Sequence, residues 1–437
     1  MDPKRKILVL GASGLIGRFI TDDLRARGFE VLGVARKLAR SQKSGPHDLE
    51  LAIMSMDTSA LEKPLRERAI DVVVNCLGVL QDGPGSSTTI VHCDFVARLL
   101  QAVRDSGRAI RLVHISIPGT AESDRTAFAT TKREAERLIA ASGIPYAILR
   151  PGFVVAPAAY GGSAMLRALA ALPIDLPATE RTAPFQPVAV EDVAATIAWL
   201  AARDSTEAGA VSWDLMQPQA ITLGGVIGHF RHAFGTQDWS RVALPSFLLD
   251  LGCRLGDLAS LIGWMPPMRT TAMAELRRGV TGDPAGWMAA TGIVPTTIGQ
   301  ITGRPAAIQD KWFARLFLLK PLVIASLVLF WFVSGFIALV ISYDAAAGIL
   351  RTHNFPAALI APITILTSLM DMSIGVLIAF RRTCGYGLVA GILASLGYMT
   401  GSAILTPDLW IEPLGALVKT GPAILLMLVA LLTLDGR

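Results

Sequence analysis

The sequence KILVLGASGLIG at Lys6–Gly17 decides the fold of the N-terminal part of the chain. Its first residues form a short apolar run, which passes directly into a turn that contains three glycines. An amphipathic stretch, Phe19–Arg27, ends at Gly28, and a second apolar run, Phe29–Val34, comes next. A strand, a glycine turn, a helix and a strand within about thirty residues form the βαβ unit that binds dinucleotides.

Each glycine of this turn has a separate task. Gly11 allows the tight turn, Gly14 lets the backbone approach a pyrophosphate, and Gly17 lets the helix pack close to the sheet. The free N–H groups at the start of the helix then face the phosphates. The motif is G-x-x-G-x-x-G, because Ala12 stands where the commoner pattern has a glycine. The alternative is a structural turn that binds nothing. The residues that we expect to bind the cofactor here are Gly11, Ala12, Ser13, Gly14, Leu15, Ile16 and Gly17.

The end of the second strand indicates which dinucleotide is bound. An acidic residue at this place would bind the ribose 2′-hydroxyl of NAD(H), but the chain has Arg36 and Lys37. Two cations favour the 2′-phosphate, so NADP(H) is the expected cofactor and NAD(H) the alternative. The competing interpretation is a pair of solvated surface cations.

Further strands and helices alternate along the chain. Apolar strands are expected at Ala52–Met56, Asp71–Asn75, Arg111–Ser116 and Pro145–Leu149, and helices at Phe95–Ser106 and Thr131–Ser142. Such alternation predicts an α/β fold with a Rossmann-type, doubly wound parallel sheet. Ligands of these sheets bind at the carboxyl ends of the strands. The residues that should meet along this crevice are Gly11, Arg36, Asp57, Asn75, Ser116 and Pro151.

These motifs together resemble the short-chain dehydrogenase/reductase superfamily, in its extended or atypical branch. The resemblance covers roughly residues 4–240 and rests on several stretches: the glycine turn, Asp57, Asn75–Gly78, His114–Ser116, Thr130–Lys132, Arg150–Gly152 and Gln186–Ala194. It implies hydride transfer to or from a nicotinamide. It also implies that a Tyr hydroxyl acts as acid or base, that a Lys four residues later lowers the Tyr pKa and holds the ribose, and that a Ser polarises the substrate carbonyl.

The chain departs from the family at the Tyr. Lys132 is kept, but four residues before it stands Phe128, which cannot exchange a proton. Ser116 is the nearest match to the family's Ser, so Lys132 and Ser116 are the candidate catalytic residues. Thr130, Thr131 and Tyr160 are alternatives for the missing hydroxyl. Lys132 has three interpretations: an anchor for the ribose, a catalytic group, or a solvated lysine. The atypical branch, which includes the nucleotide-binding accessory subunit of respiratory complex I, also lacks this Tyr and still binds NADP(H).

The middle of the chain, about residues 155–310, should complete the sheet and form a small substrate lobe. Within it, Leu244–Met268 is strongly apolar with sparse charges, which predicts a pair of amphipathic helices. They would lie either on the membrane surface or in the core of the lobe, and both interpretations stand. His229 and His232 lie three residues apart, but no third ligand accompanies them, so no metal site is expected.

The C-terminal part predicts a bundle of four transmembrane helices. Leu322–Ile341, Phe355–Phe380, Cys384–Thr406 and Pro413–Leu434 each reach the roughly 20 residues that cross a bilayer, with at most one charge. Cations lie before the first span and between the second and third, at Arg381 and Arg382. The positive-inside rule then places both termini in the cytoplasm, which predicts a multi-pass protein of the inner (cytoplasmic) membrane.

Two charges lie inside these predicted spans, Asp371 and Lys419. Such residues face the bundle interior and have partners or a function. They either pair, or Lys419 extends to the outer face instead. The region is similar to DoxX-like four-helix membrane proteins, partly through Lys419 and Pro422. That similarity implies a connection to quinone and thiol redox systems, by association alone.

Composition excludes several classes of protein. The formal charge of +5 comes from scattered cations without interleaved aromatic residues, so no nucleic-acid partner is expected. The basic balance instead fits membrane lipid and phosphate-bearing ligands. The four cysteines form no C-x-x-C pair, which favours a reducing compartment. No signal peptide is visible at Met1–Lys6, so we expect a cytosolic N-terminal domain.

The sequence thus predicts three regions: an NAD(P)-binding domain at 1–240, a substrate lobe or membrane-surface helices at 241–312, and a DoxX-like bundle at 313–437. The leading hypothesis is a membrane-anchored NADP(H)-dependent oxidoreductase or epimerase-like enzyme that acts on a small lipophilic or quinone-like substrate. A second hypothesis is a non-catalytic NADP(H)-binding subunit of a membrane redox complex. A third is transport or redox work by the bundle itself, with the N-terminal domain as a sensor of NADP(H).

Overall fold

The computed structural model describes residues 5–38, 48–83, 85–204, 209–411 and 415–434. Most of the predicted cytosolic N-terminus, residues 1–4, and Pro413 at the start of the predicted fourth span lie outside these ranges. The chain divides into two compact units, one formed by Met1–Arg254 with Pro267–Ala314 and the other by Leu255–Pro266 with Arg315–Arg437. The division falls inside two helices, α9 and α13. The boundaries expected near residues 240 and 312 stay predictions.

A seven-stranded parallel sheet forms the centre of the first unit, with the order β11-β6-β5-β4-β1-β2-β3. The order runs outward in both directions from β1 and β4, so the chain reverses its direction of winding between these two strands. This confirms the predicted doubly wound α/β fold. The strands are β1 (Lys6–Leu10), β2 (Glu30–Ala35), β3 (Asp48–Glu50), β4 (Val72–Asn75), β5 (Arg111–Ile115), β6 (Tyr146–Pro151) and β11 (Val211–Leu215).

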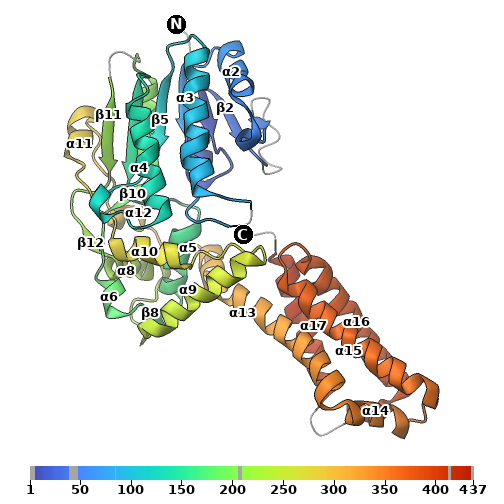
Figure 1. The fold of residues 1–437 in the computed structure, drawn as a ribbon. Coiled ribbons are helices and arrows are strands. Elements are labelled where there is room, and N and C mark those ends of the chain that lie inside the picture. Colours follow the sequence, from blue (N-terminus) through green and yellow to red (C-terminus); the bar gives the residue numbers. More distant parts are fainter. Residues whose placement is uncertain (1–4, 39–47, 84, 205–208, 412–414, 435–437) are drawn as a thin grey trace. The chain divides into compact units, whose positions relative to one another are not determined.

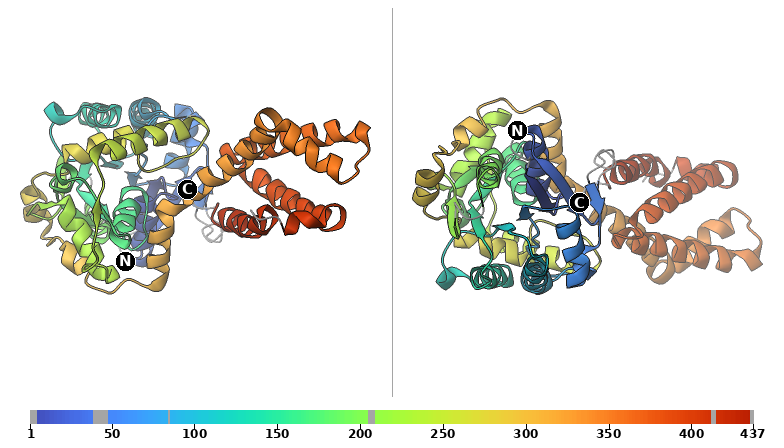
Figure 2. Two further views of the ribbon diagram at one scale, coloured as in Figure 1. Left: turned by 90° about the horizontal axis from the view of Figure 1, so that it is seen from below. Right: turned by 90° about the horizontal axis from the view of Figure 1, so that it is seen from above.

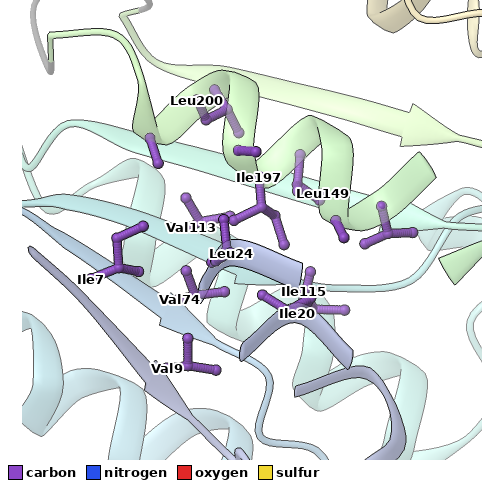
Figure 3. Close-up of a cluster of buried hydrophobic side chains, with 14 of the residues drawn as sticks. Ile7, Val9, Ile20, Leu24, Val74, Val113, Ile115, Leu149, Ile197 and Leu200 are labelled. Atoms are coloured by element: carbon purple, nitrogen blue, oxygen red, sulfur yellow. The ribbon is translucent and has the colours of Figure 1, made fainter. Parts of the chain in front are cut away.

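Helices cover both faces of this sheet (Figures 1 and 2). Side chains from α1 (Leu15–Ala26), α7 (Val190–Ala201) and α11 (Ala285–Thr291) pack on one face, as Figure 3 shows for the first two helices. Those of α2 (Thr58–Glu67) and α3 (Phe95–Asp105) pack on the other, together with α4 (Ala127–Ala140). Strands buried on both faces read as continuous apolar runs, which is why the central strands were predictable.

Two local predictions in this unit were inaccurate. Ala52–Met56 is not a strand: the edge strand β3 lies earlier, and Ile53–Ser55 forms a 3-10 turn that buries Ile53 in the core. Its apolar run therefore reflects burial of a turn rather than a strand. The helix expected from Thr131 begins at Ala127, because the Thr126 side chain caps it by accepting a hydrogen bond from the Ala129 N–H.

A smaller lobe completes the first unit. Its core joins α5 (Gly161–Ala171), α8 (Leu223–Phe234), α9 (Ser246–Leu261), α12 (Ile298–Ile301) and the first turns of α13 (Ile308–Phe336). Leu244–Met268 holds one helix, α9, rather than the expected pair, because Gly263 adopts a positive φ of 91° and turns the chain. The lobe's remaining elements are β7 (Phe153–Val155), β8 (Ile174–Asp175), α6 (Ala178–Arg181), β9 (Pro184–Phe185), β10 (Pro187–Ala189), β12 (Ile221–Thr222), β13 (Val242–Ala243) and α10 (Thr270–Arg278).

The second unit is a bundle of long apolar helices. Among the described residues, three helices are long and apolar enough to cross a membrane: α13 continued by a π-helical turn to Ile341, α15 (Ala357–Ala379) and α16 (Cys384–Leu405). The first contains the predicted span Leu322–Ile341, and the other two lie within Phe355–Phe380 and Cys384–Thr406 and end within two residues of their bounds. The fourth, α17 (Ala416–Leu432), is apolar but shorter in the described residues, so the fourth span stays a prediction. A short helix, α14 (Tyr343–Thr352), fills the loop after the first span.

Glycines let the bundle helices approach closely. A Cβ on Gly335 would lie 2.4 Å from the Ser368 carbonyl oxygen, and one on Gly375 would lie 2.7 Å from the Phe332 nitrogen. Small residues at helix contacts are typical of membrane bundles. Asp371 of α15 accepts a 2.7 Å hydrogen bond from the Tyr398 hydroxyl of α16, whereas Lys419 is exposed. The structure therefore gives Asp371 a phenol as its partner, and not the lysine that one interpretation favoured.

Candidate functional site

The glycine turn lies between β1 and α1, at the carboxyl edge of the sheet. Gly11 has a φ of +85°, and a Cβ on Gly17 would lie 2.3 Å from the Gly11 carbonyl oxygen, so helix and turn touch there. Gly14 begins α1 without a side-chain cap, which leaves the first N–H groups of the helix free for an anion. The local geometry therefore suits a dinucleotide pyrophosphate over these residues.

The next strand brings charged groups to the same edge. Arg36 and Lys37 follow β2 and are exposed. Glu50, which the sequence did not single out, lies beside Ala35 across the β2–β3 pair, and its carboxylate accepts a 2.8 Å hydrogen bond from the Leu38 N–H. The end of β2 therefore carries two cations and one neighbouring carboxylate, the groups that discriminate a 2′-phosphate from a 2′-hydroxyl.

Asp57 and Asn75 both form hydrogen bonds with their own chain, Asp57 at an exposed helix start and Asn75 in the buried sheet. Asp57 begins α2 and accepts hydrogen bonds from the Ala60 N–H at 2.8 Å and the Ser59 hydroxyl at 3.0 Å, which lower the pKa of its carboxyl. Asn75 is buried at the end of β4, where its carbonyl accepts from the Leu77 N–H at 3.1 Å. Asn75 therefore shapes the turn after β4, and its role toward a cofactor stays a prediction.

Lys132 is the buried cation of the crevice. Its side chain comes from α4, and only 4% of the residue is exposed. The Nζ atom donates hydrogen bonds to the carbonyl oxygens of Ile115 at 2.7 Å and Leu77 at 3.3 Å, at the ends of β5 and β4. Burial lowers the pKa of Lys132 to about 8. An ammonium has three donors, so one remains for a ligand. The buried, bonded side chain excludes the solvated-lysine interpretation.

Phe128 stands one helical turn before Lys132 and packs edge-on against His92, with ring centroids 5.8 Å apart. His92 Nε2 accepts a 3.2 Å hydrogen bond from the Val79 N–H, so the ring proton belongs on Nδ1, which lies 2.8 Å from Thr131 Oγ1. Burial lowers the pKa of His92 to about 3. His92 is therefore a neutral residue that fixes Thr131, a hydroxyl next to Lys132.

A second histidine lies deeper, at the end of β5. His114 Nδ1 lies 3.1 Å from the Asn75 amide nitrogen, and its buried Nε2 has no hydrogen-bond partner among the described residues. Burial lowers the pKa of His114 well below its usual value, and burial raises that of the nearby Cys76 thiol to about 12. His92, His114 and Cys76 are thus uncharged at neutral pH, and the pKa of Lys132 lies closer to neutral pH than the pKa of any of these three groups.

Ser116 is buried, and its hydroxyl has no hydrogen-bond partner among the described residues. Although burial acts in the opposite direction, hydrogen bonds from Arg150 hold the pKa of the nearby Glu136 below its usual value. Arg150 binds Glu136 through two contacts, at 2.7 and 2.9 Å. The catalytic role of Ser116 stays a prediction. Glu136 lies near Ser116 and stands four residues after Lys132, on the same face of α4. This spacing from Lys132 could have indicated Glu136 from the sequence.

Charged side chains also fix the loop after β5. Arg133 donates to the carbonyl oxygens of Pro118 at 3.0 Å and Gly119 at 2.6 Å and pairs with the buried Asp124. Arg278, from α10, pairs with Asp124 as well, at 2.7 Å. This loop therefore has a fixed shape. No spacing along the chain indicates the contact of Arg278, because Arg278 and Asp124 lie 154 residues apart.

The last predicted residue, Pro151, is buried at the end of β6. The next residue, Gly152, lies against the backbone of Gln186, because a Cβ there would lie 2.1 Å from the Gln186 carbonyl oxygen. The structure thus brings Gly11, Asn75, Ser116, Lys132 and Pro151 to the carboxyl edge of neighbouring strands. Arg36 lies at the same edge on β2, and Asp57 begins α2, beyond the edge strand β3.

Two family models match separate parts of the chain. Residues 7–211 match the NAD dependent epimerase/dehydratase family, and residues 328–428 match the DoxX-like family. The first match contains all the predicted cofactor-binding residues. The second covers most of the bundle, including Asp371, Tyr398 and Lys419.

Curated relatives match the N-terminal part only. A 3-diazoavenalumate denitrifying reductase from a Streptomyces species is 30% identical over 193 residues, 38% of this chain and 62% of the relative. The chloroplastic divinyl chlorophyllide a 8-vinyl-reductase of Cucumis sativus is 33% identical over 159 residues, 33% of this chain and 38% of the relative. A dTDP-6-deoxy-L-talose 4-dehydrogenase of Kitasatospora kifunensis is 31% identical over 110 residues, 25% of this chain and 34% of the relative. Each match spans less than two thirds of the relative.

Solved structures share the fold over a longer stretch. UDP-glucuronic acid 4-epimerase from Bacillus cereus, in complex with UDP-glucuronic acid and NAD, has a TM-score of 0.52 at 14% identity, over 71% of this chain and 99% of that chain. UDP-glucose 4-epimerase from Thermus thermophilus, in complex with NAD, has a TM-score of 0.50 at 20% identity, over 68% of this chain and 96% of that chain. At these identities the likeness shows the fold alone.

Proposed function

We propose that this chain is a membrane-anchored, NADPH-dependent reductase of a small lipophilic or quinone-like acceptor. It joins an NAD(P)-binding Rossmann domain of the epimerase and short-chain dehydrogenase type to a DoxX-like membrane bundle. The observation that carries the proposal is Lys132, held at the crevice by Ile115 and Leu77, with Phe128 where the family has its acid–base Tyr.

The residues around the crevice fit a dinucleotide. The Gly11–Gly17 turn and the free N–H groups of α1 would hold the pyrophosphate, and the remaining donor of Lys132 would hold the nicotinamide ribose. Asn75 and Pro151 would shape the backbone on either side. When bound, a dihydronicotinamide supplies a hydride. The chain's own contribution is to orient it, to keep water away from Lys132, and to fix Thr131 through His92.

The absence of the phenol indicates the class of reaction. Oxidation of an alcohol, the first step in epimerisation of a sugar, needs a base to take the hydroxyl proton, and Phe128 cannot do so. Reduction of an electron-poor double bond or quinone needs only a hydride and a proton that water can supply. Two of the relatives are reductases by name. The buried Ser116 hydroxyl has no hydrogen-bond partner among the described residues, and Thr131 is fixed by His92, which supports polarisation of the acceptor rather than strong acid–base work.

We propose NADP(H) over NAD(H) because Arg36 and Lys37 follow β2. The structural neighbours bind NAD, and Glu50 beside Ala35 is an acidic group of the type that binds a ribose 2′-hydroxyl. NAD(H) is therefore the alternative. Titration of the purified protein with each dinucleotide separates the two.

The bundle supports the lipophilic substrate and the location in the proposal. Helices α13, α15 and α16 are long enough to cross a bilayer, so a substrate dissolved in lipid would be concentrated near the enzyme. Arg381 and Arg382 after α15 support a cytoplasmic N-terminal domain in the inner membrane.

Oxidation of NADPH by the full-length protein in nanodiscs tests the proposal. We expect absorbance loss at the NADPH band when short-chain quinones or lipophilic enones are added, and none with the Gly17→Val variant, which fills the turn. Binding of NADPH without turnover, with every acceptor tried, would replace the proposal by a non-catalytic nucleotide-binding subunit of a membrane complex, the function that Phe128 also favours. The Phe128→Tyr variant should then gain dehydrogenase activity only if the remaining site is intact.

A further inference from the structure

Helix α9 has two apolar faces instead of one. Its inner face carries Leu249 and Cys253, which are 4% and 1% exposed and belong to the core of the lobe. Its outer face is a continuous stripe at helical spacing, and all of its side chains are at least half exposed. We call these residues the outer stripe: Phe247 (68%), Leu251 (50%), Leu255 (55%), Leu258 (60%) and Leu261 (70%). A stripe this long on a soluble surface indicates a partner.

The chain after α9 is fixed to the end of a membrane helix, within the second unit. The indole N–H of Trp264 donates a 2.8 Å hydrogen bond to the Ala379 carbonyl oxygen, the last residue of α15. The Arg381 N–H donates to the Ile262 carbonyl oxygen at 3.1 Å, and the Arg381 guanidinium lies 5.5 Å from the Trp264 ring. Trp and Arg at the end of a span mark the boundary between lipid and water.

These two observations identify the partner. The last residue of α15 lies where a span leaves the hydrocarbon, so the segment bonded to it, and the end of α9 just before it, lies at the same level. We propose that α9 lies along the membrane surface with its outer stripe in the lipid. Met265, which is 68% exposed, extends the apolar surface beyond the turn.

The charges on α9 fit a bilayer surface better than a second protein copy. Arg254 is exposed and lies between Leu251 and Leu255 in the outer stripe, where its long side chain can reach lipid phosphates. Asp250, at the flank of the stripe, is already paired with Arg277 at 2.9 Å. The exposed surface of α9 is therefore apolar and carries one exposed cation, Arg254. Helices that lie in the interface of anionic membranes have this pattern.

Fluorescence at single positions tests this proposal in the full-length protein. Leu258→Cys, labelled with bimane in nanodiscs of phosphatidylcholine and phosphatidylglycerol, should be quenched by lipids that carry a nitroxide on the acyl chain and protected from aqueous iodide. The matched control is Lys63→Cys on α2, an exposed position of the first unit, which should show the opposite pattern. The variants should be made without the partly exposed Cys76 and Cys93, each replaced by Ser.

Iodide quenching at Leu258→Cys as strong as at Lys63→Cys would overturn the proposal. So would a disulfide-linked dimer through position 258 in nanodiscs that hold two copies, because the stripe would then bind a second chain. The Arg254→Glu variant gives an independent measurement. Its bimane signal at position 258 should lose lipid quenching several-fold in anionic nanodiscs and change little in purely zwitterionic ones. Neither result depends on NADPH turnover, so the proposal and the proposed reductase activity fail separately.

Discussion

The Nζ atom of Lys132 donates a 2.7 Å hydrogen bond to the carbonyl oxygen of Ile115, at the end of β5. This bond, with a longer one to Leu77, fixes a buried cation from within the protein. The lysine keeps its place although Phe128 stands where the family has its Tyr, so the part of the site proposed to hold a cofactor remains without the usual acid and base.

Removing this cation should weaken nucleotide binding. Lys132→Met keeps the length and apolar stem of the side chain but loses the charge, and a hydrogen bond to a charged group contributes about 1.5–3 kcal/mol. We expect the Kd for NADPH to rise roughly ten-fold or more, measured by titration calorimetry. Lys63→Met, at an exposed position, is the control. An unchanged Kd for Lys132→Met would mean that the lysine serves only the fold.

Substitutions at the end of β2 should change the preference for the cofactor. Arg36→Glu places a carboxylate where the 2′-phosphate is expected, so NADPH affinity should fall by about 1–3 kcal/mol while NADH affinity is kept. The ratio of the two Kd values measures the effect. The control is Arg18→Glu, at an exposed position on α1. It tests whether the same change of charge elsewhere lowers the affinity for NADPH as much as Arg36→Glu does. Equal losses for both dinucleotides would favour the interpretation of Arg36 as a solvated surface cation.

His92 should make the protein sensitive to acid. Burial lowers its pKa to about 3, whereas an unfolded histidine titrates near 6.5. Between these values the unfolded state binds the extra proton, so stability falls as pH drops below about 6.5, by about 1.4 kcal/mol per pH unit for this group. His92→Asn should flatten this slope in urea unfolding curves followed from neutral to acidic pH, while His232→Asn, at an exposed position, should leave it steep. His114 adds a slope of its own, so the flattening is partial.

Arg111 should contribute to stability without affecting the site. It is 1% exposed at the start of β5, and its guanidinium donates to the carbonyl oxygens of Leu200, Arg203 and Asp204 at the end of α7. A cation there satisfies carbonyls that the helix cannot. Arg111→Met should lower the free energy of unfolding by about 1–3 kcal/mol for each buried carbonyl group that is left unpaired. The Kd for NADPH, measured below the unfolding transition, should stay within a factor of two or so of the parent.

The bond between Asp371 and Tyr398 should couple α15 to α16. Asp371→Asn and Tyr398→Phe each remove one end of the 2.7 Å bond, so the double variant should be less destabilised than the sum of the two single ones. Polar bonds between membrane helices contribute about 0.6–2 kcal/mol, which sets the expected coupling energy. Unfolding in detergent with increasing dodecyl sulfate provides the measurement. Strict additivity would show that the two side chains stabilise the bundle independently.

The central strands and the glycine turn were predictable because they depend on local patterns. Runs such as Val72–Val74 are apolar and buried on both faces, and Gly17 leaves room that no other residue could leave. The cofactor side of the site follows from the same turn. The membrane helices were predictable for a similar reason, since α15 and α16 need little more than length and hydropathy.

The contacts that define the rest of the site are not local. His92 meets Thr131 across 39 residues, and Arg278 meets Asp124 across 154, so no spacing along the chain reveals them. The predicted strand at Ala52–Met56 failed because an apolar run has the same appearance in a strand and in a buried 3-10 turn. The outer stripe of α9 was visible as an apolar segment, but only the bonds of Trp264 and Arg381 show what lies beside its end.

The division of the chain inside α9 and α13 has a consequence for its synthesis. The core of the first unit includes Ala314, which is fully buried, so this unit cannot be completed until the ribosome has passed the start of α13. The segment Leu255–Pro266 reaches its final contacts later, because its hydrogen bonds are to Ala379 and Arg381, which are synthesised after α13. A nascent chain would therefore finish its first unit while its first span is entering the membrane, and a chain cut inside α9 should not fold because it lacks Pro267–Ala314 of that unit.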